Sequence, residues 1–317
     1  MSKSKIEWTD RVWNPVTGCT KISEGCKNCY AERQSKRFAG MNGYPADDPF
    51  KVTLHPDRLE EPLHWKKPSR IFVCSMGDLF HGDVTMGFIS RVFSTIRRCP
   101  QHTFIVLTKR PVKMLHAVND YVDGALPNLW LGVTAENQET ADERIPLLLK
   151  TPAAVRFVSI EPMLGPVSFR WSAWDGLGTK KITDHLDGLR MLDWVICGGE
   201  SGPGARPMHP DWARSLRDQC KEAAVPFFFK QWGEWGTRAF NMQTDEPVFR
   251  MFRDKQEWIN HARTWINGGI CIDTAGQILN CGGDFDTARY PVSILHKLGK
   301  KLTGHLLDGV EHREFPK

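Results

Sequence analysis

Short apolar runs recur along much of the chain, and a polar turn follows each of them. The runs hold four or five residues and are rich in β-branched and aromatic side chains, which is typical of strands covered on both faces. They lie at residues 70–74, 103–107, 129–133, 155–159, 194–197 and 226–229, with a further possible strand at residues 11–16. The pattern therefore predicts a series of short, buried strands.

Segments with helical periodicity lie between several of these runs. Residues 84–98 place their apolar side chains on one broad stripe, and residues 136–149 end in the apolar sequence IPLLL. Residues 211–224 follow a proline, which suits the start of a helix. Alternating strands and helices indicate parallel strands joined by right-handed crossovers, in either an open sheet or a barrel.

The alternation stops near residue 233, and this change divides the chain into two predicted parts. Residues 1–232 are predicted to form an α/β domain, and residues 233–317 a small irregular extension with a possible hairpin at residues 270–279. In an open sheet and in a barrel alike, ligands bind where the parallel strands end at their carboxyl edge. That edge is where we expect the site.

Composition narrows the class of protein. Of the 317 residues, 41% are hydrophobic and 25% charged, which excludes a disordered or collagen-like chain. Residues 1–13 lack the apolar core of a signal peptide, and no run of about 18 apolar residues occurs, so we expect a cytoplasmic protein without a membrane partner. The formal net charge of +5 permits contact with nucleic acid without requiring it.

Three of the nine cysteines are close in sequence. Cys19, Cys26 and Cys29 form a C-x6-C-x2-C loop before a segment of helical character. Structural zinc takes four ligands, often from two matched pairs, and no second pair exists in the sequence. Three thiolates without a fourth suit a [4Fe–4S] cluster with one open iron. The alternative is structural zinc completed by a distant residue such as Cys74 or His81.

The other six cysteines are scattered, mostly within apolar runs. Thiols stay reduced in the cytoplasm, and the odd total does not favour a complete disulfide framework. We therefore interpret these six as small buried hydrophobic residues. They are Cys74, Cys99, Cys197, Cys220, Cys271 and Cys281.

Polar residues follow each predicted strand, where a parallel sheet would bring them to one edge and one cavity. Asp78, Lys109 and Glu161 are the candidate catalytic residues. Asp78 has two interpretations: it forms an acid–base pair with His81, or it caps the helix predicted from residue 84. The candidate cofactor-binding residues are Tyr30, Ser75, Glu136, Asn137, Ser159, Gly198, Gly199, Glu200, Ser201 and Lys230. For any one of them, Ser201 for example, a turn or a helix cap is the alternative interpretation.

Several motifs resemble known families. The loop with Cys26, Cys29 and Tyr30 resembles that of the radical S-adenosylmethionine enzymes, although its first spacer has six residues in place of the usual three. Over nearly the whole length, the chain resembles phage and bacterial proteins of unassigned function that are described as radical-S-adenosylmethionine-like. The motifs that carry this resemblance are WNPVTGC, CSMGDLFH, LTKRP, LGVTAEN, VSIEPMLGP, WVICGGESGPGARP, FFFKQWG and GKKLTGHLLDG. LTKRP is also similar to a strand end of the spore photoproduct lyase group, which repairs DNA.

The resemblance implies a fold and a chemistry. The fold is a partial (β/α)6-type TIM-like barrel over residues 1–232, with the cluster loop at residues 19–29. Cys19, Cys26 and Cys29 would hold a [4Fe–4S] cluster whose open iron binds S-adenosylmethionine. An electron from a flavodoxin or ferredoxin would then give methionine and a 5′-deoxyadenosyl radical. Gly198, Gly199 and Glu200 resemble a motif that binds the amino group of S-adenosylmethionine, but here the motif ends a later strand.

The expected substrate class is a nucleic acid or a nucleotide, in a bacterial cell or a phage-infected host. The phage association of the resembling family, the positive net charge and the twelve tryptophans favour it. Lys66, Lys67, Lys109 and Arg110 would contact phosphates, while most of the tryptophans are expected in the core. The alternative function is a non-enzymatic nucleic-acid-binding protein with a structural zinc site.

Overall fold

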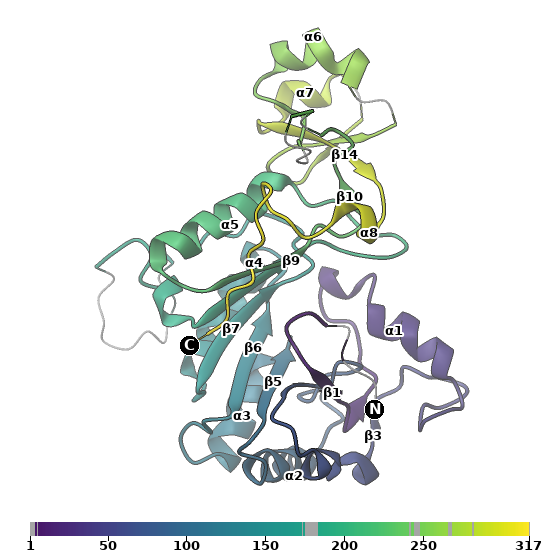
Figure 1. Cartoon of the computed structure of the whole chain (residues 1–317), viewed down its shortest axis with the longest axis vertical. Helices are drawn as coiled ribbons and strands as arrows, with labels where there is room; N and C mark the ends of the chain where they lie inside the picture. The colour runs from purple at the N-terminus through teal and green to yellow at the C-terminus, as the bar shows by residue number, and fades with distance from the viewer. Residues whose placement is uncertain are drawn as a thin grey trace.

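A computed structural model of the chain describes residues 4, 6–172, 174, 183–240, 242–243, 248–265, 268–280 and 282–316. Seven strands in the first three quarters of the chain form one sheet, in the order in which they follow along the chain (Figure 1). Every neighbouring pair in this sheet is parallel. The strands are β1 (Arg11–Trp13), β4 (Arg70–Val73), β5 (Thr103–Thr108), β6 (Leu129–Thr134), β7 (Val155–Ile160), β8 (Trp194–Gly198) and β9 (Phe227–Gln231).

The sheet curls into a half-barrel whose edges are β1 and β9. This confirms the α/β prediction and the six apolar runs that were predicted as strands from residue 70 onward. The strand predicted at residues 11–16 is instead divided in two. Its first half is β1, whereas β2 (Val16–Thr17) leaves the sheet and pairs antiparallel with β3 (Thr53–Leu54).

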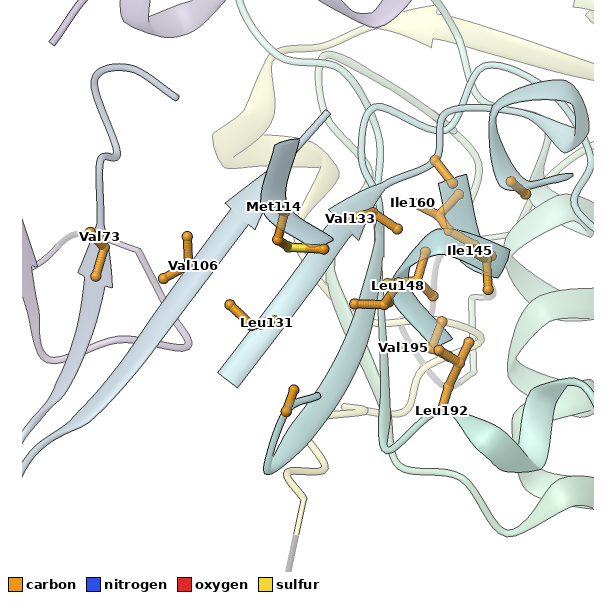
Figure 2. Close-up of a cluster of buried hydrophobic side chains, with 14 of the residues drawn as sticks. Val73, Val106, Met114, Leu131, Val133, Ile145, Leu148, Ile160, Leu192 and Val195 are labelled. Atoms are coloured by element: carbon orange, nitrogen blue, oxygen red, sulfur yellow. The ribbon is translucent and has the colours of Figure 1, made fainter. Parts of the chain in front are cut away.

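Helices cover the convex face of the sheet. They are α2 (Met86–Arg97), α3 (Pro111–Tyr121), α4 (Gln138–Lys150) and α5 (Pro210–Ala223). Figure 2 shows how apolar side chains from the sheet, from α3 and from α4 meet in this layer. No helix was predicted at α3, although Pro111 begins it and Met114, Ala117 and Val118 are buried on one face. Shorter elements are α1 (Tyr30–Ser35) and the 3-10 helices Glu24–Cys26, Lys36–Phe38, Pro56–Arg58, Glu61–His64 and Leu189–Met191.

A second apolar cluster fills the concave face toward the amino ends of the strands. Trp194 lies at its centre, and its ring contacts those of Trp8, Phe157 and Phe228 at centroid distances of 5.7–6.2 Å. Gly132 leaves space for the neighbouring ring of Phe157, because a Cβ at position 132 would collide with that ring. The other members are Phe72, Ile105 and Ile196, with Ile6, Val12, Leu107, Trp130 and Phe315 packed against them.

The two ends of the chain meet at this aromatic cluster. The C-terminal segment runs along β9, where the amide of Phe229 donates to the carbonyl of His312 at 2.9 Å. The indole of Trp194 donates to the carbonyl of Glu314 at 2.8 Å. An ion pair of 3.6 Å between Arg313 and Glu7 joins the two terminal segments. The final residues thus cover one edge of the half-barrel.

The described part of residues 233–316 is more regular than the extension that the pattern predicted. Five short strands form an antiparallel sheet in the upper part of Figure 1, and it includes the predicted hairpin. The strands are β10 (Trp235–Gly236), β11 (Met251–Phe252), β12 (Ile270–Ile272), β13 (Ile278–Leu279) and β14 (Val292–Lys297), and the helices are α6 (Lys255–Trp265), α7 (Asp284–Thr287) and α8 (Lys300–Thr303). Four of the five strands hold only two or three residues, which is too short for a period of two to be recognised.

No helix among the described residues has both the length and the apolar character needed to cross a bilayer.

Candidate functional site

Charged side chains replace the aromatic ones at the carboxyl ends of the strands. Side chains of a strand alternate between its two faces, so Lys109 continues the concave face of Ile105 and Leu107. Four carboxylates at this edge each form an ion pair with a nearby cation. The pairs are Asp78–Arg110, Glu136–Lys109, Glu161–Lys230 and Glu200–Arg206. We call this set the charged rim.

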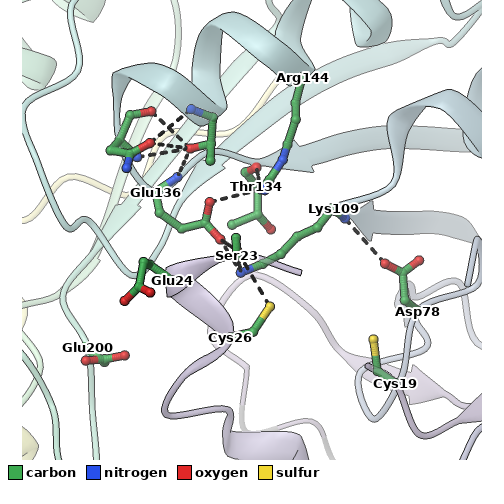
Figure 3. A network of polar contacts seen from close by, with 12 residues as sticks. Cys19, Ser23, Glu24, Cys26, Asp78, Lys109, Thr134, Glu136, Arg144 and Glu200 are labelled. Atoms are coloured by element: carbon green, nitrogen blue, oxygen red, sulfur yellow. Dashed lines mark hydrogen bonds and ion pairs between the residues drawn. The ribbon is translucent and has the colours of Figure 1, made fainter. Parts of the chain in front are cut away.

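Glu136 is the most deeply buried carboxylate of the rim, with 1% of the residue exposed. As Figure 3 shows, Lys109 contacts one of its oxygens, and Arg144 donates to the other at 2.9 Å. Ser23 of the cysteine loop donates to the Lys109 side of the same carboxylate at 2.6 Å. Burial raises the pKa of Glu136, but the two cations and the hydrogen bonds outweigh it, so its pKa is lowered. A Cβ at Gly25 would collide with this carboxylate, so the loop lies directly on it.

Cys26 lies beside the same network. Its sulfur is 3.7 Å from the hydroxyl of Ser23. Burial raises the pKa of Cys26, but the ammonium of Lys109 and hydrogen bonds from the loop outweigh this effect, so its pKa is lowered. A lower pKa favours the thiolate, which is the form that binds metal.

Cys19 lies in a different electrostatic environment, next to the Asp78–Arg110 pair. The guanidinium of Arg110 is 3.3 Å from the Cys19 sulfur and 3.0 Å from Asp78. Burial and the Asp78 carboxylate raise the pKa of Cys19 to about 11, although Arg110 acts in the opposite direction. Cys19 and Cys26 therefore lie beside different ion pairs of the rim.

Asp78 is a buried member of the rim and does not cap a helix. The hydroxyl of Thr108 donates to both of its oxygens at 2.8 and 2.9 Å, and the amide of Phe80 donates at 2.9 Å. The N-cap of α2 is Thr85, which accepts from the amide of Phe88. The helix-cap alternative for Asp78 is therefore wrong.

Glu161 and Lys230 come together from β7 and β9. The ammonium of Lys230 donates to both carboxylate oxygens of Glu161 at 2.7 and 2.9 Å. Both side chains keep about a fifth of their surface exposed, at 21% and 18%. A Cβ at Gly198 would lie 3.4 Å from the Glu161 carboxyl carbon, which is an ordinary contact, so the end of β8 lies directly beside this pair. Among the four ion pairs of the rim, this is the one in which both side chains are exposed to about this extent.

The remaining candidate residues differ in the contacts that they form. The side chain of Asn137 is used locally, because it caps α4 and forms a capping box with Thr140. Ser75 and Tyr30 do meet, since the Tyr30 hydroxyl donates to the carbonyl of Ser75. Ser159 is buried on β7, and the carbonyl of Ser201 accepts from Arg33 at 3.1 Å.

Two important cations were missed by reasoning from the sequence. Arg144 is buried in α4 and holds Glu136, and Arg206 holds Glu200. Arg144 lies on the buried side of α4 together with Ile145 and Leu148. Arginine is rarely buried without a partner, so an arginine at such a position is the signal that could have identified it. Arg206 ends the glycine-rich segment after β8, from which only Gly198, Gly199, Glu200 and Ser201 were predicted as site residues.

The cysteine loop supplies suitable donors for a metal group without gathering them around one point. Cys19, Cys26 and Cys29 are half-buried, whereas the other five described cysteines are buried, and Cys281 lies outside the described residues. Within the part of the chain that the structure describes, no group of three or more His, Cys, Asp or Glu side chains is placed to hold a metal ion. The residue types therefore fit a thiolate-bound group, but their present orientation does not form a coordination site.

Neither candidate for a fourth zinc ligand is free in this arrangement. The Nδ1 atom of His81 accepts from the amide of Asp83 at 3.1 Å, and its Nε2 atom is 2.8 Å from the Thr20 hydroxyl. Since Nδ1 is an acceptor, Nε2 carries the proton and donates to Thr20. Cys74 is buried, with 4% of the residue exposed.

The cations expected to contact phosphate do not form one surface. Lys109 and Arg110 are paired with Glu136 and Asp78 at the carboxyl edge of the sheet. Lys66 and Lys67 precede β4 and therefore lie toward its amino edge, opposite the rim. Among the tryptophans whose exposure is described, Trp171 is the strongly exposed one, at 69%.

Comparison with protein families gives one match. The model of a family described as "Protein of unknown function (DUF5131)" matches residues 3–316. Comparisons with curated proteins and with solved structures find no match. The match covers both the half-barrel and the C-terminal sheet.

Proposed function

The chain belongs to this family of unknown function, DUF5131, and from its site we propose that it is a radical S-adenosylmethionine enzyme. In this proposal Cys19, Cys26 and Cys29 hold a [4Fe–4S] cluster, and residues 1–232 act as a partial (β/α)6-type barrel. The observation that carries the proposal is the contrast between two sets of cysteines. Three half-buried ones share one loop on the charged rim, and the five other described ones are buried in apolar surroundings.

The position of the loop supports a cofactor role. Its residues contact three of the four ion pairs of the rim, through Ser23, Cys19 and Asn28. The carboxyl edge of a parallel sheet is where barrels and open α/β sheets bind their ligands. When bound, the cluster would supply one low-potential electron to the sulfonium of S-adenosylmethionine.

The residues of this chain would prepare the site rather than carry the electron. Lys109 lowers the pKa of Cys26, although burial opposes it, and so favours the thiolate needed for iron. Glu161 and Lys230 present opposite charges 2.7 Å apart on the concave face, which suits a ligand with both an ammonium and a carboxylate. Tyr30, Ser75, Ser159, Gly198 and Gly199 would line the remaining wall.

The substrate is proposed only as a class, a nucleic acid or a nucleotide. The support for this substrate class is weaker than the support for the cofactor. Two of the four cations named for phosphate contacts are paired with carboxylates, and the other two lie at the opposite edge of the sheet. A flavodoxin or ferredoxin is the proposed electron donor, and the cytoplasm is the proposed location.

Anaerobic reconstitution of the full chain tests the proposal. Iron, sulfide and zinc are quantified, and methionine release from S-adenosylmethionine is then followed after reduction. We expect about four iron and four sulfide per chain, together with methionine formation. Uptake of zinc alone would favour the structural zinc protein, and a chain that holds iron but never cleaves S-adenosylmethionine would contradict the proposed reaction.

A further inference from the structure

The end of β8 is tied to the cysteine loop through one arginine. The guanidinium of Arg206 donates to both carboxylate oxygens of Glu200, at 2.9 and 2.7 Å, and its amide donates to Glu200 at 2.8 Å. The same guanidinium reaches the loop, where it donates to the carbonyl of Glu24 at 2.9 Å and to its carboxylate at 3.3 Å. Arg206 therefore bridges a strand end and the residue two positions before Cys26.

A second contact joins the same two segments. The side-chain amide of Asn28 donates to Glu200 at 3.0 Å and to the carbonyl of Gly204 at 2.8 Å. Gly204 has a φ of +77°, and a Cβ there would lie 2.9 Å from the Asn28 side chain. Only glycine meets both conditions without strain. Asn28 lies between Cys26 and Cys29, so the loop is held both before and within its CxxC pair.

These contacts occupy Glu200 inside the protein. With 6% of the residue exposed, its carboxylate accepts four hydrogen bonds, three from Arg206 and one from Asn28. Hydrogen bonds between charged groups are stronger than neutral ones, and buried ones are less screened by salt. A carboxylate used in this way has little capacity left for the amino group of a cofactor.

We infer that Glu200 and Arg206 are positioning residues, which together with Asn28 form a latch that holds Glu24–Cys26 and Cys29 against the end of β8. The latch reassigns Glu200, which the resemblance had assigned to cofactor binding. Cys19 has a separate anchor, because it contacts Arg110 on the other side of the rim. The inference rests on the proposed function only for the identity of the group that the loop carries.

The test compares Arg206→Ala, Arg206→Lys and Glu200→Gln in the full chain without metal. Alkylation rates of Cys19, Cys26 and Cys29 are measured by mass spectrometry at several pH values, together with hydrogen exchange of residues 19–29. In Arg206→Ala we expect Cys26 and Cys29 to react roughly tenfold faster at every pH, with an unchanged rate at Cys19. Arg206→Lys should recover part of the protection, and Arg170→Ala, which removes an exposed pair with Glu222, should change nothing.

Each result separates the latch from the proposed function. A loop that is released in Arg206→Ala supports the latch even if the wild-type chain never binds iron, which would contradict only the proposed function. Unchanged alkylation and exchange in Arg206→Ala would overturn the latch, whatever the iron content. The latch would also be overturned if Glu200→Gln weakened S-adenosylmethionine binding to the iron-loaded protein and left loop protection intact, because Glu200 would then contact the cofactor itself.

Discussion

The concave face of the half-barrel has two halves with opposite chemistry. Toward the amino ends of the strands, buried aromatic and aliphatic side chains surround Trp194, and Trp8 and Phe315 from the two terminal segments pack there. Toward the carboxyl ends, four carboxylates are paired with cations, and the cysteine loop lies on them. The same seven strands therefore carry a hydrophobic core at one end and a polar site at the other.

The difference indicates what each half is for. Burying apolar surface stabilises the fold, at roughly 25 cal/mol for each Å². Buried ion pairs contribute little net stability, because the cost of removing charges from water offsets their attraction. A protein under selection for stability alone would extend the aromatic cluster to both ends. The charged rim is therefore better explained by binding and positioning than by stability.

The largest effect is expected from the aromatic half. Trp194→Ala removes a fully buried indole, its ring contacts and its hydrogen bond to the carbonyl of Glu314. We expect the free energy of unfolding to fall by about 3–5 kcal/mol, measured by urea denaturation. The control is Lys230→Met combined with Glu161→Gln at the rim, which leaves neither charge unpaired and should change it by less than about 1 kcal/mol. Equal losses in the two variants would break the proposed division of the face.

A smaller loss is expected when one partner of the buried rim network is removed. Glu136→Ala leaves the guanidinium of Arg144, whose side chain is 3% exposed, without its carboxylate. The expected cost is about 3 kcal/mol, because an uncompensated charge remains buried. The double variant Glu136→Leu with Arg144→Met should recover most of it. If the double variant is as unstable as the single one, the network stabilises the fold itself and the comparison fails.

As the pH falls, the contacts of the charged rim should open before those of the aromatic half. The pKa values of Glu136 and Glu200 are lowered, because their cations and hydrogen bonds outweigh a burial effect that by itself raises them. The unfolded chain therefore binds more protons than the folded one, so stability that is present above the ordinary glutamate pKa of about 4.3 is lost as pH falls below it. Hydrogen exchange of residues 19–29, corrected for the intrinsic rate at each pH, should rise in this range while β7 and β8 stay protected.

The matched control for this pH effect is an exposed carboxylate. Glu60→Gln removes the charge of a carboxylate that is 67% exposed and pairs with Arg98 at 3.5 Å, so it should leave the acid response unchanged. Glu136→Gln removes one of the two titrating carboxylates, so the rise in hydrogen exchange of residues 19–29 at low pH should be smaller. Loss of protection at β7 and β8 at the same pH as in the loop would show that the two halves do not respond separately.

Much of the half-barrel could be predicted from the sequence, because each strand is a short apolar run bounded by polar turns. The expectation that Glu161 and Lys230 lie at one carboxyl edge followed from the sequence, but their ion pair was not predicted. The helix at α3 was missed because its apolar side is narrow, and the C-terminal sheet because its strands are short.

The ion pairs and hydrogen bonds of the rim could not be predicted, since they join segments that are far apart in the chain. Arg206 and Glu24 are 182 positions apart, and nothing local to either indicates the other. Asn137 shows the opposite error, because it lies at a strand end but its side chain serves the first turn of α4. A position at the right edge of a sheet therefore identifies candidates, and only the direction of each side chain decides among them.

The central claim is that the three loop cysteines, and not the buried ones, carry an iron–sulfur cluster. The most direct measurement is the iron and sulfide content after anaerobic reconstitution of three proteins: wild type, a variant with Cys19→Ser, Cys26→Ser and Cys29→Ser, and the buried control Cys99→Ser. We expect about four iron per chain in wild type and in Cys99→Ser, and none in the triple variant. Equal iron in all three proteins, or zinc in place of iron in wild type, would contradict the claim.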